Sequence, residues 1–228
     1  SFEQLCAASL EVVRANGLTN AYLRPLAFFD SYGFAVWPKD CPVTVAIIAV
    51  PGRVYIDGAD LGIRVMISST RRIDASVLPP NVKACGHYTN SVRAVQEAMR
   101  NGFDEAILLN NKGDVAEGSG ANLFVVKGGA LTTNDVNASI LPGITRDSVL
   151  TIARDLGVPI DIRPISIADV RDADELFFSG TAVEVVPIRQ VDDRVIGAGS
   201  PGPLTRRLRA AYQDAVHGRS PRYHPWLA

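Results

Sequence analysis

The chain opens with an amphipathic helical pattern. Within residues 1–16 four large apolar side chains fall on one stripe of a helix, and Asn16-Gly17 supply a stop signal that favours left-handed backbone dihedrals. Apolar spacing of the same kind predicts further helices at residues 89–101, 145–156, 167–170 and 203–216.

Apolar runs rich in β-branched residues lie between these helices. Residues 20–29 and 43–50, separated by Asp, Gly and Pro turn chemistry, predict two strands of a small sheet. A second set of strands is predicted at residues 62–68, 106–109, 123–126, 130–133, 175–178 and 183–190. Short Gly-containing turns join the three runs between residues 106 and 133, which indicates a meander and disfavours a doubly wound parallel sheet.

The apolar periodicity lapses at residues 53–60, which makes this segment the best linker candidate. We therefore expect residues 1–52 to belong to a small domain and residues 61–228 to form a larger one. Because helices and strands are mixed in both parts, the expected fold class is α+β.

Composition narrows the possible functions. The chain has 228 residues, of which 47% are hydrophobic, so it can bury a full core. The 23 Lys and Arg residues nearly balance the 24 Asp and Glu residues, so the chain has no net positive potential that would attract nucleic acid or an anionic membrane. A small metabolite is the more natural partner. No apolar run approaches the roughly 20 residues of a membrane span. Three cysteines outside any CxxC pair disfavour disulfides and structural zinc and fit a reducing, cytoplasmic location.

The candidate chemistry rests on one lysine and one carboxylate. Lys83 follows a stiff Pro-Pro lead-in, and its small neighbours leave room for a planar ring. We expect Glu117 to lie in a glycine-lined turn, because residues 118–121 are small enough to let backbone approach a ligand. Lysine amines form Schiff bases with aldehydes, and a carboxylate facing a pyridine nitrogen keeps it protonated, so the pair suits pyridoxal phosphate. Either residue alone is more simply a solvated surface residue.

Two further turns suit an anion. The Pro-Gly turn at residues 141–146 enters a helix whose N-terminus offers unpaired N–H groups to a phosphate, although Thr145 also suits an ordinary cap. Residues 179–182 place two hydroxyls after a strand, in a turn that can also be a plain bend. Walker-type, Gly-x-Ser-x-Gly and His-x-x-x-His motifs do not occur, so nucleotide hydrolysis, serine esterase and zinc chemistry lose support.

Taken in order, these segments resemble the fold-type IV aminotransferases, which are pyridoxal-phosphate enzymes. The resemblance spans residues 1–216 and is carried by Lys83-Ala-x-x-x-Tyr88, Glu117-Gly-x-Gly-x-Asn122-Leu-Phe, Leu141-Pro-Gly-Ile-Thr-Arg146 and Gly180-Thr181-Ala-x-Glu184-Val-x-Pro187. It implies a small α/β domain and a larger domain built from a mixed sheet, or pseudo-barrel, with helices. Ala21-Tyr22-Leu23-Arg24-Pro25 resembles the branched-chain amino acid aminotransferase version of the family.

The resemblance also implies a role for each matching residue. Lys83 is the catalytic Schiff-base lysine and proton shuttle, Glu117 the partner of the pyridinium nitrogen, and Tyr88 a donor to the ring oxygen. Further cofactor contacts fall on Asn122 and on the phosphate-binding positions Leu141, Gly143, Ile144, Thr145 and Thr181. Substrate contacts fall on Tyr22, Arg24, Tyr55, Gly120, Thr181 and Ala182, with Arg24 recognising the acidic side chain of glutamate or 2-oxoglutarate.

We therefore expect transamination between branched-chain L-amino acids (Leu, Ile, Val) and 2-oxoglutarate, giving branched 2-oxo acids and L-glutamate, in a homodimer or higher homo-oligomer. Three alternatives stay open on the same scaffold: a D-amino-acid or (R)-amine transaminase, an aminodeoxychorismate-lyase-like enzyme, and a non-catalytic homologue. The family's N-terminal segment and its phosphate-binding arginine have no match here, so we expect this chain to be part of a longer protein. Cys85 and His87 stand where the family usually has Gly and Asn.

Overall fold

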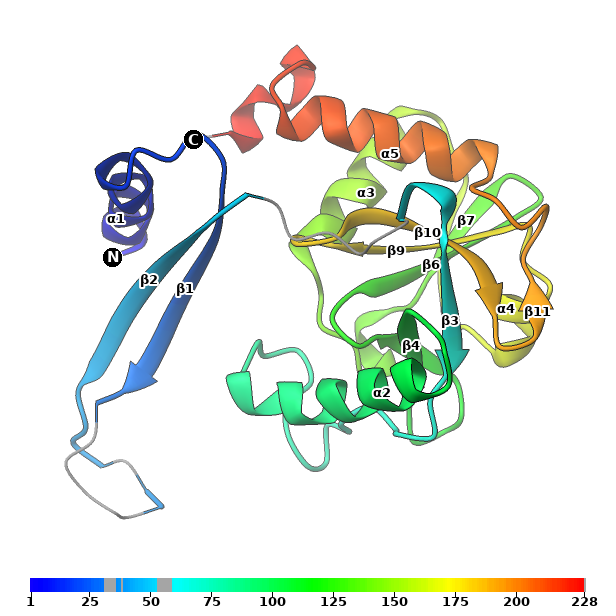
Figure 1. Cartoon of the computed structure of the whole chain (residues 1–228), viewed down its shortest axis with the longest axis horizontal. Coiled ribbons are helices and arrows are strands. Elements are labelled where there is room, and N and C mark those ends of the chain that lie inside the picture. The colour runs from blue at the N-terminus through cyan, green and yellow to red at the C-terminus, as the bar shows by residue number, and fades with distance from the viewer. Residues whose placement is uncertain (31–35, 38, 53–58, 228) are drawn as a thin grey trace. The chain divides into compact units, whose positions relative to one another are not determined.

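The computed structural model describes residues 1–30, 36–37, 39–52 and 59–227, and the chain separates into two compact units (Figure 1). The first unit is Ser1–Tyr55 and the second is Ile56–Ala228. Most of the predicted linker, residues 53–58, lies outside the described residues.

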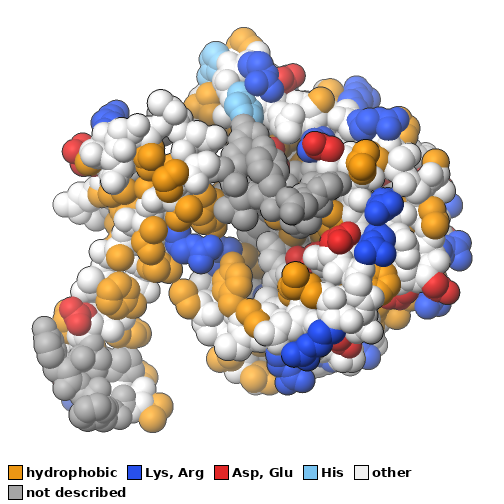
Figure 2. All heavy atoms as spheres, viewed as in Figure 1, with side chains coloured by type: hydrophobic (Ala, Val, Ile, Leu, Met, Phe, Trp, Pro, Cys, Tyr) orange, Lys and Arg blue, Asp and Glu red, His pale blue; other side chains and the backbone are white. Residues whose placement is uncertain are grey.

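The first unit pairs one helix with a two-stranded antiparallel sheet. Helix α1 (Phe2–Ala15) begins at a capping box between Ser1 and Gln4. Strands β1 (Ala21–Phe29) and β2 (Val43–Pro51) pair along their whole length. This confirms the helix and both strands expected from the pattern. Apolar side chains gather over the hairpin in Figure 2, because alternate side chains of β2 and the end of β1 are exposed.

The second unit is built on a mixed sheet that curls around an apolar core (Figure 1). Its strands run in the order β5-β4-β3-β10-β9-β6-β7-β8, with β11 paired to β10. Their bounds are β3 Ile63–Ile67, β4 Glu105–Leu109, β5 Val115–Gly118, β6 Asn122–Lys127, β7 Ala130–Thr133, β8 Ile160–Ile162, β9 Glu175–Gly180, β10 Glu184–Val191 and β11 Arg194–Val195. Three pairs are parallel, β3 with β4, β3 with β10 and β7 with β8. The predicted α+β class with a mixed sheet is confirmed.

Helices cover both faces of this sheet. Figure 1 shows α3 and α5 on one side and α2 on the other. Their bounds, with the short α4, are α2 Tyr88–Arg100, α3 Ile144–Asp155, α4 Ile167–Arg171 and α5 Pro203–Val216. Within the described part of the chain, no helix is both long and apolar enough to cross a membrane.

Strand β6 shows how the sheet divides the core. Leu123 and Val125 pack into one buried cluster with α4, whereas Phe124 and Val126 pack into another with α3 and α5. Successive strand residues point to opposite faces, so a strand buried on both sides is apolar throughout. The ring of Phe124 stacks on Phe177 at 4.8 Å between centroids, which joins β6 to β9 across the second cluster.

The structure corrects three predictions. Glu117 lies in strand β5, paired with Leu108 of β4, and not in a glycine-lined turn. All four residues of β5 are buried, so no alternation marks the strand. The N-cap of α3 is Gly143, not Thr145. The meander expected over residues 106–133 is interrupted, because strands β3, β10 and β9 lie between β4 and β6 in the sheet.

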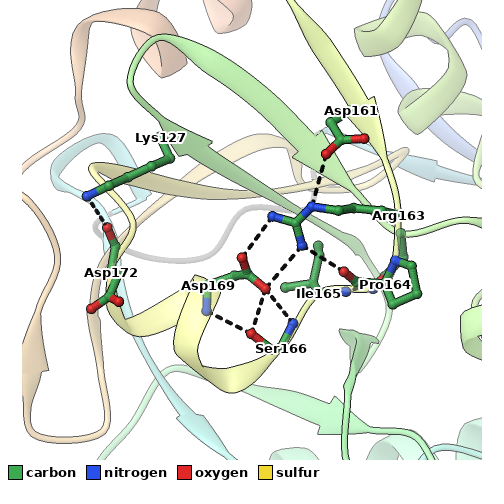
Figure 3. A network of polar contacts seen from close by, with 9 residues as sticks. Lys127, Asp161, Arg163, Pro164, Ile165, Ser166, Asp169 and Asp172 are labelled. Carbon is green, nitrogen blue, oxygen red and sulfur yellow. Dashed lines mark hydrogen bonds and ion pairs between the residues drawn. The ribbon is translucent and has the colours of Figure 1, made fainter.

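A polar network fixes the loop that leads into α4 (Figure 3). Arg163 pairs with Asp161 and Asp169, and Ser166 and Asp169 form a capping box. Hydrogen bonds from Arg163 hold the pKa of Asp169 well below its usual range. At the start of α4, the Ile165 backbone N–H donates to the Asn134 side-chain oxygen. The amide nitrogen of Asn134 donates to the backbone carbonyls of residues 115 and 116, so this network also anchors β5.

Candidate active site

A pocket in the second unit brings most of the predicted residues together. It is lined by residues from the segment before α2, from β5, from the start of α3 and from the end of β9. The predicted residues that line it are Lys83, Tyr88, Glu117, Gly120, Asn122, Leu141, Gly143, Thr145 and Thr181. Four further lining residues belong to segments that the sequence singled out, namely Ser119, Ala121, Ser179 and Gly180. The remaining lining residues, none of them assigned to the site from the sequence, are Arg72, Val82, Ala84, His87 and Ser91.

Lys83 reaches the pocket from the segment just before α2. A 3-10 helix, Cys85–His87, follows it and leads directly into Tyr88, the first residue of α2. This turn brings the Lys83 amine within 3.1 Å of the Tyr88 hydroxyl oxygen, to which it donates a hydrogen bond. The tyrosine therefore orients the one lysine of the pocket.

Glu117 is the buried acid of the pocket, with only 4% of its surface exposed. One carboxylate oxygen accepts a hydrogen bond from Arg72 Nε at 2.7 Å. The other accepts from the Asn122 amide at 3.0 Å and from the Leu141 backbone N–H at 3.1 Å. Burial raises the pKa of Glu117 to about 7, against the opposing effect of Arg72 and of the Leu141 N–H. A carboxyl group with this pKa holds or releases a proton near neutral pH.

Arg72 lines the pocket, although the sequence patterns did not point to it. Its side chain is buried, and its backbone N–H donates to the Leu109 carbonyl at 2.8 Å, which fixes the arginine beside β4. It pairs with Glu117 across a separation of 45 residues, so no local spacing connects the two. The available signal is chemical, because a buried carboxylate needs a cation and an arginine is the usual choice.

The start of α3 forms one side of the pocket. Gly143 is its N-cap, and no side chain caps the helix. Thr145 in the first turn is buried and lines the pocket. The uncapped N–H groups and the positive end of the helix dipole suit a phosphate.

Asn122 connects this helix start to Glu117. Its amide nitrogen donates both to the Glu117 carboxylate and to the Leu141 carbonyl, the latter at 2.8 Å. Its oxygen lies so close to Gly143 that a Cβ atom added there would be 2.3 Å away. The glycine is therefore required by the packing of Asn122.

Five predicted residues lie elsewhere or are not described. Ile144 is 75% exposed and, like Ala182, does not line the pocket. Tyr22 and Arg24 belong to β1 of the first unit, where the Arg24 guanidinium lies 5.5 Å from the centre of the Tyr22 ring. Tyr55 lies outside the described residues.

Comparisons with known proteins agree on one family. The family model for class IV amino-transferases matches residues 1–191. A branched-chain-amino-acid aminotransferase of Pseudomonas aeruginosa is 41% identical over 228 residues, which cover 99% of this chain and 74% of that protein.

Two solved structures match nearly the whole chain. The branched-chain aminotransferase of Thermoproteus uzoniensis with norvaline superposes with a TM-score of 0.94 at 40% identity, covering 99% of this chain and 75% of that one. The PLP form of the branched-chain amino acid aminotransferase of Thermobaculum terrenum also gives 0.94, at 38% identity, covering 100% of this chain and 75% of that one.

Replacement of Gly143 by alanine should destabilise the protein. The new Cβ would displace Asn122 and break its hydrogen bonds to Glu117 and Leu141, so we expect a loss of about 1–3 kcal/mol in unfolding free energy, measured by urea denaturation. Gly120→Ala is the matched control, because a Cβ there meets nothing within 4 Å and should be neutral or slightly stabilising. Equal effects of the two substitutions would contradict this account of Gly143.

Glu117 should make the stability of the cofactor-free protein depend on pH. Because its folded pKa is raised from 4.5 to about 7, the folded state holds the proton more tightly, and this contribution to stability is lost as pH rises through that range. The unfolding free energy of wild type should fall by about 1–3 kcal/mol more than that of Glu117→Gln between pH 5 and pH 8. Urea titrations of both proteins at these two pH values measure the difference. Parallel pH profiles would show that burial does not raise this pKa.

Proposed function

Because the chain belongs to the class IV aminotransferases, we propose that it exchanges amino groups between branched-chain L-amino acids and 2-oxoglutarate with pyridoxal phosphate as cofactor. The observation that carries this proposal is the pocket itself, in which Lys83 with Tyr88 and Glu117 with Arg72 line one cavity. The names of the relatives at about 40% identity support the branched-chain substrates.

The donor groups of the pocket fit pyridoxal phosphate. When bound, this cofactor supplies an aldehyde to which a lysine attaches and a ring that withdraws electrons from the substrate Cα. The pocket has one lysine for the aldehyde and one buried carboxylate for the ring nitrogen. For the phosphate it has the uncapped start of α3 at Gly143 and the hydroxyls of Thr145 and Thr181. Gly120 borders open space, since a Cβ there would meet no atom within 4 Å.

In this proposal Lys83 transfers the proton at the substrate Cα, and Tyr88 positions Lys83 for the transfer. The lysine amine takes and returns this proton, and the tyrosine hydroxyl 3.1 Å away holds the amine in place while it does so. Both groups come from one short stretch of chain, so the folding of the 3-10 turn sets their separation. A positioned base of this kind typically contributes about two to four orders of magnitude in rate.

In this proposal Glu117 shares a proton with the ring nitrogen, and Arg72 orients the Glu117 carboxylate. A carboxyl group whose pKa is about 7 shares a proton readily with a weakly basic nitrogen near neutral pH. Arg72 opposes protonation of the free acid and keeps the carboxylate oriented, together with Asn122 and Leu141. With the cofactor bound, this arrangement would favour a protonated ring nitrogen, whose positive charge would stabilise negative charge at the substrate Cα.

Substrate selection is the part of the proposal that involves the first unit. A leucine side chain is apolar and that of 2-oxoglutarate ends in a carboxylate, so the enzyme needs a cation that only the second substrate meets. Arg24 is exposed on β1, and no carboxylate among the described residues pairs with it. Its contact with the Tyr22 ring leaves the guanidinium edge available to a carboxylate.

The assembly and the compartment are also part of this proposal. We infer a homodimer or higher homo-oligomer from the family resemblance. A reducing, cytoplasmic location fits the free thiols of Cys6, Cys41 and Cys85.

Loss of Lys83 should almost abolish turnover. For Lys83→Ala we expect the rate of 2-oxoglutarate formation from L-glutamate and a branched 2-oxo acid to fall by about two to four orders of magnitude, and borohydride should no longer attach cofactor to the protein. Lys127→Ala is the control, because Lys127 is an exposed lysine of the same unit that pairs with Asp174 away from the pocket. In wild type, L-leucine should convert the visible absorption of the bound cofactor to that of the amine form. If D-alanine or a chiral amine, and not L-leucine, converted the bound cofactor to its amine form, the result would favour a D-amino-acid or (R)-amine transaminase.

Arg24→Ala should discriminate between the two substrates. We expect kcat/KM for 2-oxoglutarate to fall by about tenfold or more, the loss of one charge-assisted hydrogen bond, with a much smaller change for L-leucine. Arg14→Ala, which removes an exposed arginine of α1 in the same unit, is the charge-matched control. Equal losses for both substrates would refute the assigned role of Arg24.

A further inference from the structure

His87 lines the pocket but has no part in the chemistry proposed above. It is the last residue of the 3-10 helix Cys85–His87 and directly precedes Tyr88. Only 6% of its surface is exposed, and it shares the pocket with Lys83 and Tyr88. A titratable side chain that is nine-tenths buried in a ligand pocket needs an explanation.

The two ring nitrogens of His87 are not equivalent. Nδ1 is completely enclosed and has no hydrogen-bond partner among the described residues. Nε2 is not enclosed in this way, so it is the nitrogen open to water or to a ligand. The other two histidines are exposed and bond to backbone carbonyls, His217 through Nδ1 at 2.7 Å and His224 through Nε2 at 3.0 Å. His87 is thus the histidine whose hydrogen bonding is left to a ligand.

The position of the proton follows from this difference. A buried N–H without an acceptor forfeits a full hydrogen bond, whereas an N–H on the open nitrogen finds one in water or in a ligand. The neutral ring therefore carries its proton on Nε2. His87 then presents a donor to the pocket.

The surrounding side chains indicate what this donor meets. Lys83, Tyr88 and Ser91, one helical turn beyond His87, all bring donor groups to the same pocket. The carboxylate of Glu117 is already engaged by Arg72, Asn122 and Leu141. A wall of donors is complementary to an oxygen acceptor that carries negative charge.

We propose that His87 is a ligand-binding residue whose Nε2–H donates a hydrogen bond to an anionic oxygen in this pocket. The oxygen belongs either to the cofactor ring or to the α-carboxylate of the substrate. This inference rests on the proposed function, because that function supplies both oxygens. It assigns to His87 a hydrogen bond that the Lys83 and Tyr88 pair does not provide.

Nitrogen-15 NMR of protein labelled at histidine tests the proposal without any substitution. The free protein should show the Nε2–H form of His87. The His87 Nε2 resonance should shift when pyridoxal phosphate is added if the acceptor is the ring oxygen, or only on later addition of 4-methylvaleric acid if the acceptor is a carboxylate. His217 and His224 are internal references, because both already bond to backbone carbonyls.

Two substitutions separate hydrogen bonding from packing. His87→Leu removes the donor, and we expect about tenfold weaker binding of pyridoxal phosphate or of 4-methylvaleric acid, according to which ligand moved the resonance. His87→Gln places an amide donor near the position of Nε2 and should recover most of that affinity. Equilibrium titration monitored by absorbance measures both affinities.

Three results would overturn the proposal: a Nε2 resonance unmoved by either ligand, a His87→Leu protein that binds both ligands as wild type does, or equal losses in His87→Leu and His87→Gln. Borohydride reduction of wild type in the same samples tests the proposed function separately. Cofactor fixed to Lys83 with an unmoved His87 resonance contradicts only the role of His87. Absence of fixed cofactor contradicts the proposed function as well.

Discussion

The buried ion pair between Arg72 and Glu117 is the constraint on which the site depends. Truncating either side chain would leave its partner buried without a counterpart, at a cost of about 3–5 kcal/mol. A well-packed apolar pair would stabilise the fold equally well, so stability does not explain why the charges are there. The proposed function gives a reason, because it assigns the Glu117 carboxyl group to the ring nitrogen of the cofactor. Strand β5 and the Asn134 side chain that anchors it keep this acid in place.

Asn122 links Glu117 to the start of α3. One amide donates to Glu117 and to the Leu141 carbonyl and packs against Gly143 at the start of α3. The proposed function assigns Glu117 to the ring nitrogen and the start of α3 to the phosphate, and both are held by this one side chain. A rigid ligand with those two ends needs the two protein groups at a constant separation. Because one side chain holds both groups, this separation is set before binding, and no further conformational entropy is lost when the ligand binds.

The helices and the long apolar strands were predictable because their periodicity is local. The roles of Lys83 and Glu117 came from ordered motifs, and most of the residues in these motifs do line one pocket. Strand β5 was missed because a short strand buried on all sides has no alternation, and Glu117 was therefore assigned to a turn. Arg72 was missed for another reason. Its partner is 45 residues away, and pairing across the sheet leaves no signal in the spacing of either residue.

The turn that connects Lys83 to Tyr88 also determines where this pocket can vary. A 3-10 turn followed at once by the first turn of α2 brings the two residues to 3.1 Å, and their positions in the chain must be kept for this contact to form. His87 is placed in the pocket wall by the same turn, so a change there alters what the wall donates while leaving the lysine and tyrosine in register. Binding of the ligand can thus be adjusted independently of the proton transfer at Lys83.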